Sequence, residues 1–353
     1  MRILILGGTA WLGRTVAEVA VQAGHDVTCV ARGTGVPEGV TLVQADRDLD
    51  DALSAVARAD GAEAEGGQPS GAGTRWDAVI DVSLQPGHVR RAVRDLEPVA
   101  AKYLFVSTCS VYADQGEGGA DEDAPLLEPL AGDRMEAMEQ YGHAKVACEQ
   151  AVLDGFGAER SVIVRPGLIG GPGDPSGRTG YWAHRFTRPS NPDGRVLVPD
   201  ATELPTAVID VRDLAEFLIH VAVGAGQGVF NALGEPVPFP EHIEAARVAA
   251  QGVIRSERPV KPVRAAQDWL VEHGVAEWAG PRSLPLWIAD RDWYGMNTRS
   301  IDRARAAGLI LRPLADTLAD SLAWDLEHQV ELPHGAGLTD QEERDLLGAL
   351  GQS

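Results

Sequence analysis

The stretch that decides the fold is Arg2-Ile3-Leu4-Ile5-Leu6-Gly7-Gly8-Thr9-Ala10-Trp11-Leu12-Gly13. Residues 2–6 form a continuous apolar run, which is typical of a strand buried on both faces of a parallel sheet. The glycines that follow allow backbone N–H groups to approach a phosphate, and residues 14–23 predict a helix that ends at Gly24. An ordinary tight turn would explain the glycines alone. A strand, a glycine turn and a helix in this order instead predict a dinucleotide-binding unit.

Further apolar runs follow at intervals that suit the same architecture. The predicted strands cover residues 25–30, 40–44, 78–83, 103–106, 161–165 and 228–232. Helical patterns occupy residues 48–59, 89–96 and 141–153. The alternation of strands and helices predicts an α/β fold with a doubly wound, Rossmann-like parallel sheet.

The chain is long enough for a second, smaller unit. We expect residues 1–165, completed by 208–232, to form the dinucleotide-binding domain. Residues 166–207 and 233–353 would form a mainly C-terminal substrate-binding lobe. Segment 61–74 is rich in small and polar residues, and we interpret it as a surface insertion.

Charge and composition exclude several classes of partner. The 353 residues include 31 Lys and Arg against 52 Asp and Glu, which gives a formal net charge of -21 and argues against nucleic acids and anionic membrane surfaces. No apolar run approaches the roughly 20 residues of a membrane span. The three cysteines have no regular spacing, which favours reduced thiols in the cytoplasm. We expect no metal, because His184 lacks a cluster of potential ligands.

Two further motifs suit proton transfer. In Tyr141-Gly142-His143-Ala144-Lys145, a phenol and an ammonium share one face of a predicted helix. A phenol beside an ammonium ionises more readily and can exchange a proton near a reacting centre. In Ser107-Thr108-Cys109-Ser110-Val111-Tyr112, Thr108 follows a strand, at the edge where open α/β sheets bind ligands. Taken alone, Tyr141 and Lys145 could be an exposed pair of side chains on a helix surface. Thr108 alone could be a hydroxyl that hydrogen-bonds to nearby backbone groups.

Together with the glycine turn and segment 208–215, these motifs resemble the extended or atypical, epimerase/dehydratase-like branch of the short-chain dehydrogenase/reductase superfamily. The resemblance implies NAD(P)-dependent hydride transfer on a carbonyl/alcohol pair, with Thr108, Tyr141 and Lys145 as the catalytic residues. Lys145 would bind the nicotinamide ribose and Tyr141 would move the proton. Thr108 would fix the substrate oxygen.

The resemblance also implies a cofactor site. Its expected members are Gly7, Thr9, Ala10, Trp11, Leu12, Gly13, Arg32, Asp46, Arg47, Val82, Lys145, Pro166 and Leu168. Ala31 stands where NAD-binding relatives carry an acidic ribose ligand, and Arg32 can pair with a 2′-phosphate. Arg14 is a second candidate for that phosphate. We therefore expect NADP, with NAD as the alternative, although Ala10 replaces the middle glycine of the family's turn.

The expected substrate-binding residues are Ser83, Thr108, Arg178, Trp182 and Arg185. Residues 177–190 bring aromatic and basic side chains into an acidic protein, which favours an oxygen-rich or anionic small molecule. Any one of these side chains could equally pack inside a helical arm. The long acidic loop at 113–140 is expected to be functional or mobile. We also consider a homodimer.

Departures from the family pattern separate the enzyme types. Sugar-nucleotide dehydratases carry Asp-Glu after the catalytic threonine, where this chain has Cys109-Ser110. Epimerases carry an arginine where this chain has Thr206, although Arg178 or Arg185 could substitute for it. We expect an NADP-dependent oxidoreductase, and a reductase in particular. A sugar or sugar-nucleotide epimerase is the alternative enzyme. A catalytically idle NADP-binding scaffold or regulator, including one with an RNA partner, is the alternative of another class.

Overall fold

The computed structural model describes residues 1–58, 75–224, 226–253 and 259–351. The expected surface insertion at 61–74 lies outside the described residues. Within these ranges, no helix combines the length and apolarity that crossing a membrane requires.

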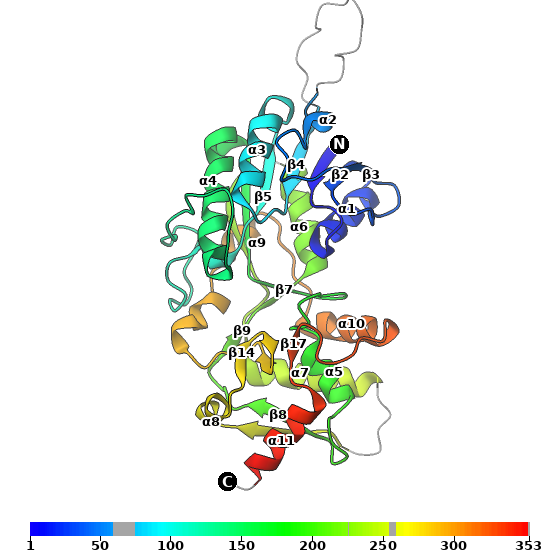
Figure 1. The fold of residues 1–353 in the computed structure, drawn as a ribbon, viewed down its shortest axis with the longest axis vertical. Coiled ribbons are helices and arrows are strands. Elements are labelled where there is room, and N and C mark those ends of the chain that lie inside the picture. Colours follow the sequence, from blue (N-terminus) through cyan, green and yellow to red (C-terminus); the bar gives the residue numbers. More distant parts are fainter. Residues whose placement is uncertain (59–74, 225, 254–258, 352–353) are drawn as a thin grey trace, which may run out of the picture.

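A seven-stranded parallel sheet forms the upper part of the molecule in Figure 1. Its strands are β1 (Arg2–Leu6), β2 (Asp26–Ala31), β3 (Thr41–Gln44), β4 (Ala78–Asp81), β5 (Tyr103–Val106), β6 (Ser161–Pro166) and β11 (Gly228–Ala232). Their order is β11-β6-β5-β4-β1-β2-β3, so the direction of winding reverses between β1 and β4. The expected doubly wound sheet is confirmed, and the reversal is the place where such sheets bind ligands.

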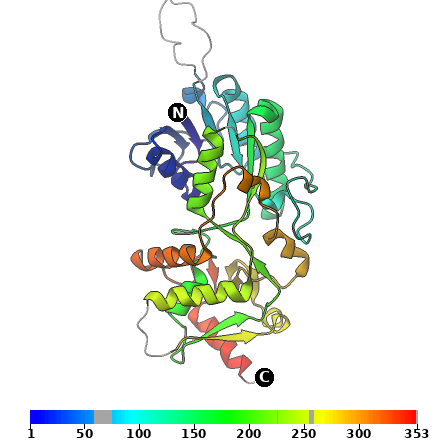
Figure 2. The same ribbon diagram turned by 180° about the vertical axis from the view of Figure 1, so that it is seen from behind.

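Helices cover both faces of this sheet (Figures 1 and 2). Successive strand residues point to opposite faces, so Ile3 and Ile5 pack with α1 (Trp11–Gln22) and α6 (Val211–Val223). Leu4 and Leu6 face α3 (Pro86–Leu96) and α4 (Tyr141–Arg160). The unbroken apolar run of β1 is thus explained, because neither face of the strand meets water.

A second hydrophobic core lies below the sheet, and we call the elements around it the C-terminal lobe. They are α5 (Tyr181–Thr187), α7 (Phe239–Val253), α10 (Leu314–Glu327), α11 (Asp340–Leu350) and the strand pair β8 (Arg195–Pro199) and β13 (Lys261–Ala265). One late segment returns to the sheet, because α9 (Asp302–Ala306) packs against β11. The expected domain boundaries themselves stay a prediction.

Shorter elements complete the described chain. They are α2 (Ser54–Ala57), α8 (Gln267–Glu272), β7 (Leu168–Gly170), β9 (Pro205–Thr206), β10 (Val208–Asp210), β12 (Val237–Pro238), β14 (Ala276–Trp278), β15 (Gly280–Pro281), β16 (Ser283–Pro285), β17 (Ala336–Gly337) and the 3-10 turns η1 (Glu97–Val99), η2 (Cys109–Val111), η3 (Met138–Gln140) and η4 (Arg291–Asn297).

The helix expected over 48–59 is wrong for most of that range, since only α2 forms there. The Asp46 carboxylate accepts a hydrogen bond from the Asp48 N–H at 3.0 Å, and the Asp48 carboxylate lies 2.7 Å from His88 Nε2. Short acidic side chains that bind nearby backbone compete with helix formation in this way.

Candidate active site

The glycine turn joins β1 to α1 at the carboxyl edge of the sheet. Gly7 has a φ of 107°, which side chains rarely tolerate, and a Cβ on Gly13 would lie 2.3 Å from the Gly7 carbonyl oxygen. The turn therefore closes against the start of α1. Ala10, the residue before α1, forms no side-chain cap, so the first N–H groups of the helix have no capping side chain. This edge has the backbone shape and the positive helix end that a pyrophosphate requires.

The far end of this expected cofactor site lies beyond β2. Arg32 is exposed directly after that strand, and Ala31 before it is buried. Arg14 donates to the Gly35 carbonyl at 2.8 Å, which brings a second guanidinium to the same loop. These two guanidiniums are the candidate partners of a 2′-phosphate, and Arg14 also pairs with Glu18 at 3.1 Å. Alanine at position 31 exerts none of the repulsion that an acidic side chain would. Asp46 is exposed after β3.

Thr108 stands between β5 and η2. Its hydroxyl oxygen accepts from the Ser110 N–H at 3.1 Å, and the hydroxyl lies 3.2 Å from Ser110 Oγ. The side chain therefore caps the 3-10 turn and also lines a cavity at the sheet edge. Local capping and exposure to a ligand coexist at this residue.

Tyr141 is the first residue of α4, and its neighbour Gly142 sets its position. A Cβ on Gly142 would lie 2.2 Å from the Ser110 carbonyl oxygen, so only glycine lets α4 approach η2 this closely. The close approach brings the phenol of Tyr141 and the hydroxyl of Thr108 into one cavity. In the sequence, Gly142 is only one of the residues between Tyr141 and Lys145, and this spacing does not reveal its packing role.

Lys145 lies one helical turn after Tyr141 and is buried. Its ammonium donates to the backbone carbonyls of Ser83 and Val106, each at 2.8 Å, and lies 4.6 Å from the centre of the Phe105 ring. These two carbonyls come from the ends of neighbouring strands β4 and β5. An ammonium has three protons, so one remains for a ligand in the cavity.

A buried ion pair supports the first of these carbonyls. Arg47 donates to both oxygens of Asp81, at 2.9 and 3.2 Å, and Tyr103 donates to the same carboxylate at 2.6 Å. Burial raises the pKa of Asp81, but the charge of Arg47 and the hydrogen bonds outweigh it and hold this pKa below its usual value. The Ser83 hydroxyl also contacts Asp81 and Arg47. Arg47 and Ser83 thus support the Lys145 site through Asp81, and their expected cofactor and substrate roles stay predictions.

A second buried pair lies under β5 and β6. Arg165 donates to both oxygens of Glu149, at 3.0 and 2.7 Å, and the Ser107 hydroxyl also contacts Glu149. Burial lowers the pKa of Arg165, but its bonds to Glu149 outweigh this effect and raise it overall. Glu149 lies on α4 one helical turn after Lys145, and its contact with Ser107 joins it to the residue before Thr108. The two buried ion pairs were not predicted, because the partners are far apart in the sequence.

We call the space around the catalytic motifs the inner cavity, of about 590 Å³. It is lined by Trp11, Leu12, Val82, Val106, Ser107, Thr108, Cys109, Ser110, Gln115, Met138, Tyr141, Lys145, Pro166, Gly167, Leu168, Ile169, Asp174, Pro175, Ser176, Arg178, Trp278, Trp293, Met296 and Asn297. The structure thus brings together the three expected catalytic residues, five expected cofactor neighbours and Arg178. The sequence did not predict four of the lining residues, which are Trp278, Trp293, Met296 and Asn297. They lie far along the chain from the quoted motifs and form no motif of their own.

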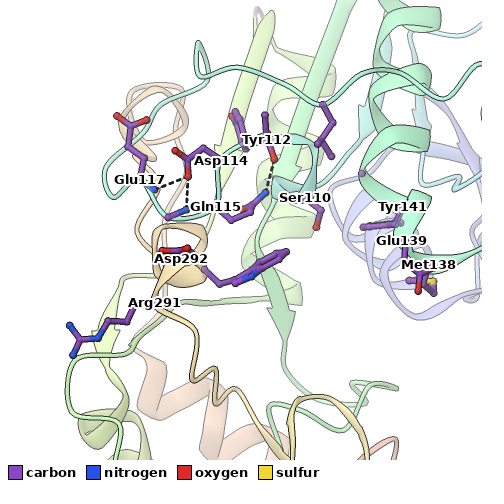
Figure 3. Close-up of a pocket in the computed structure, with 15 residues that line it drawn as sticks. Ser110, Tyr112, Asp114, Gln115, Glu117, Met138, Glu139, Tyr141, Arg291 and Asp292 are labelled. Carbon is purple, nitrogen blue, oxygen red and sulfur yellow. Dashed lines mark hydrogen bonds between the residues drawn. The ribbon is translucent and has the colours of Figure 1, made fainter. Parts of the chain in front are cut away.

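An outer cavity of about 990 Å³ opens beside the inner one, and Ser110, Gln115, Met138, Tyr141 and Trp293 line both. Figure 3 places Tyr141, Glu139 and Met138 at one side of it and Asp114, Arg291 and Asp292 at the other. Its charged lining consists of Asp114, Glu117, Glu139, Asp292 and Arg291. The one arginine pairs with Glu203, so this space is acidic.

Two expected substrate residues lie elsewhere. Trp182 and Arg185 are fully buried in the C-terminal lobe. The Trp182 indole donates to the Pro285 carbonyl at 2.9 Å, and Arg185 donates to the Leu338 carbonyl at 2.6 Å and pairs with Asp340 and Glu343. Their placement in a substrate wall is therefore wrong. Both face the hydrophobic core, because α5 is buried on nearly its whole circumference.

Other reactive groups offer no additional chemistry at this edge. Burial raises the pKa of Cys29, Cys109 and Cys148 to about 12, which keeps their thiols protonated. In the part of the chain that the structure describes, no group of His, Cys, Asp and Glu side chains could hold a metal ion.

Comparison with known proteins gives one family model and several relatives. The model of the NAD dependent epimerase/dehydratase family matches residues 3–232. A 2-alkyl-3-oxoalkanoate reductase from Stenotrophomonas maltophilia is 29% identical over 276 residues, which cover 74% of this chain and 78% of the relative. A chloroplast stem-loop binding protein of 41 kDa from Arabidopsis thaliana is 23% identical over 239 residues, 66% of this chain and 59% of that protein.

Solved structures agree in fold. A UDP-N-acetylglucosamine 4-epimerase from Bacillus cereus superposes with a TM-score of 0.62 at 15% identity, covering 94% of this chain and 98% of that one. At this identity the likeness concerns the fold alone. The match of the family model over most of the chain, on the same strands and turns that carry the glycine turn and the Tyr141–Lys145 helix, shows that this chain belongs to the NAD dependent epimerase/dehydratase family.

Proposed function

We propose that the protein is an NADP-dependent oxidoreductase that acts on a carbonyl/alcohol pair, working mainly as a reductase. One arrangement carries this proposal. Thr108, Tyr141 and Lys145 line a single cavity at the reversal point of the sheet, and two backbone carbonyls fix the ammonium of Lys145. NADP bound along the glycine turn would supply or accept the hydride.

Each catalytic side chain then has a defined task. Tyr141 gives a proton to the carbonyl oxygen during reduction and takes it back during oxidation. Thr108 donates a hydrogen bond that stabilises the oxygen as negative charge develops. Lys145 keeps one proton for the cofactor ribose or the phenol, because its other two are held by Ser83 and Val106. Gly7, Thr9, Gly13 and the start of α1 would hold the pyrophosphate, with Arg32 and Arg14 at the 2′-phosphate.

The epimerase alternative has less support from the site. Thr206, at the position of the epimerase arginine, is buried and hydrogen-bonds His242 and the Val237 carbonyl. Arg185 is buried and paired, and the outer cavity is acidic, which opposes a nucleotide diphosphate. The reductase name of the Stenotrophomonas relative favours the same choice.

The idle-scaffold alternative rests on the name of the Arabidopsis relative, a stem-loop binding protein. The net charge of -21 opposes an RNA partner, since RNA binding draws on cationic surfaces. A small-molecule substrate suits the cavities better. We also propose the cytoplasm as the location, with three buried, unpaired cysteines in support, and a homodimer stays a proposal.

The test is a screen of ketones, alcohols and sugar nucleotides by nicotinamide absorbance. On a compound that reacts, Tyr141→Phe should lower turnover about 10²–10⁴-fold without weakening cofactor binding, because general acid–base catalysis contributes that much. Lys145→Ala should weaken both, and Thr108→Val should lower turnover less than Tyr141→Phe. Tyr294→Phe, which changes a tyrosine outside both cavities, is the control. Parental turnover in Tyr141→Phe would refute the proposed mechanism.

A separate measurement tests the preference for NADP over NAD. The dissociation constants of NADP and NAD are compared in the parent and in Arg32→Ala. Losing a charge-assisted pair should weaken NADP binding by about 1.5–3 kcal/mol and leave NAD binding nearly unchanged. Equal affinities of the parent for the two cofactors would overturn the choice of NADP.

A further inference from the structure

Among the residues that the structure describes, Arg178 is the one arginine that lines the inner cavity. It lies in the loop between β7 and α5 and is half-buried. Burial lowers the pKa of Arg178, and the charge of Asp174 opposes this shift. The guanidinium shares the inner cavity with the phenol of Tyr141. A cation next to the reacting centre bears directly on which substrates bind there.

The guanidinium of Arg178 is largely unused within the protein. Its Nε donates to the Ser176 hydroxyl at 3.1 Å, and its carbon lies 5.2 Å from the centre of the Trp278 ring. Its two terminal nitrogens have no hydrogen-bond partner, and no carboxylate lies within 4.0 Å, among the residues that the structure describes. Four N–H donors therefore remain available to a ligand.

Three buried arginines differ in this respect. Arg47, Arg165 and Arg185 each pair with a buried carboxylate of this chain. Arg299, which is also buried, likewise has no carboxylate partner among the described residues, but it binds the Asp114 carbonyl and does not line the inner cavity. A partly desolvated cation is costly without a partner, and a planar guanidinium binds a carboxylate through two parallel hydrogen bonds. The missing partner of Arg178 is thus expected to come from outside the protein.

The ring of Trp278 lies against one face of the Arg178 guanidinium. Trp278 has a φ of 66°, an unusual value for a bulky residue, and its N–H donates to the Trp287 carbonyl at 2.9 Å. Backbone strain of this kind persists where the surroundings hold it and gathers at ligand sites. The indole held in this position limits the directions that the Arg178 guanidinium can take, which favours binding of a planar group such as a carboxylate.

The rest of the substrate side combines apolar side chains with polar ones, among them the Asp174 carboxylate. Met138 and Trp293 are 69% and 49% exposed at the boundary of the two cavities, and Met296 and Pro175 also line the inner one. Large apolar side chains exposed at a cavity usually mark a binding surface for an apolar group. The wall therefore places the Arg178 guanidinium, with Asp174 nearby, beside an apolar surface.

We propose that the substrate is an oxo or hydroxy carboxylic acid with an apolar chain, whose carboxylate pairs with Arg178 while its carbonyl or hydroxyl oxygen meets Tyr141 and Thr108. This inference rests on the proposed oxidoreductase function. In oxidation, the carbinol C–H bond breaks and its hydride passes to the nicotinamide, while the O–H proton passes to Tyr141. Reduction reverses both transfers, so atoms and electrons balance.

The experiment uses hydroxy acids with the hydroxyl on the second, third or fourth carbon, each beside its methyl ester, with NADP as the oxidant. Esterification removes the negative charge and adds one methyl group, and the Arg178 variants separate these two effects. The parent should prefer the best acid over its ester by about ten- to a hundred-fold in kcat/KM, the worth of a charge-assisted hydrogen bond. Arg178→Gln should abolish this preference by lowering kcat/KM for the acid far more than for the ester, and Arg178→Lys should restore part of it. Arg188→Gln, an exposed arginine after α5, should match the parent.

Two outcomes overturn the inference while the proposed function stands: equal rates on acid and ester in the parent, or an acid preference that survives Arg178→Gln. If no alcohol or ketone of any class reacts, the proposed function fails, and binding then decides the role of Arg178. A saturated carboxylic acid of matched length is titrated calorimetrically into the NADP-loaded parent and Arg178→Gln proteins. Binding to the parent alone supports a carboxylate site, and absent or equal binding overturns it.

Discussion

Arg178 and Arg185 lie in one short stretch of chain but in opposite surroundings. Arg178, in the loop before α5, lines the inner cavity and has unused donors. Arg185, inside α5, is fully buried and ties that helix to α11 through Asp340 and Glu343. The comparison teaches that a cluster of basic and aromatic residues in the sequence can divide between a site and a core. Burial and partners distinguish the two uses, whereas residue type does not.

The largest expected effect concerns stability and separates the two arginines. Arg185→Met should lower the free energy of unfolding by about 3–5 kcal/mol, because it leaves the buried Glu343 without its cation. Arg178→Met removes no ion pair and should change stability by less than about 1 kcal/mol. Urea unfolding of both variants measures the difference. Equal losses would mean that Arg178 is also structural.

A smaller, pH-dependent effect on stability is expected where α10 packs against α5. Asp325 lies 3.8 Å from His184 in α5, and burial raises its pKa to about 6. The folded state therefore binds this proton more tightly than the unfolded state, so stability falls as the pH rises from about 4 to about 6. Asp325→Asn should stabilise the protein by up to about 3 kcal/mol above that window and by little below it.

Thermal or urea unfolding at both ends of the window checks this sign. Turnover should change little, since Asp325 lines a small neighbouring cavity with Tyr181 and Gly180 and does not line the inner cavity, although Asp174 lines both. A stabilisation that is the same at all pH values would show that packing, and not ionisation, is the cause.

The smallest expected effects distinguish two tryptophans. Trp182→Phe should cost about 1–2 kcal/mol of stability, because the buried Pro285 carbonyl loses its indole donor, and should leave substrate binding intact. Trp278→Phe should leave stability nearly unchanged but weaken substrate binding by about two- to tenfold, since a phenyl ring holds a cation less well than an indole. Unfolding curves and Michaelis constants of the two variants test the contrast, which the reverse pattern would contradict.

Local pattern was enough for the sheet and for much of the site. The run at residues 2–6 is apolar throughout because both faces of β1 are covered, and the glycines at 7 and 13 are required by backbone geometry. Tyr141 and Lys145 could be paired from their spacing, because a helix places residues four apart on one face. Such features depend on neighbours in the chain, so the sequence by itself determined them.

Only the tertiary structure decided which polar residues serve the site and which serve the core. Arg47 was expected at the cofactor and Ser83 at the substrate, and both also surround Asp81 at the end of β4. The side chain of Trp278 reaches the inner cavity from a segment far along the chain from Tyr141. The free energy of a buried charge depends on partners brought close by folding, and no spacing in the sequence encodes that distance.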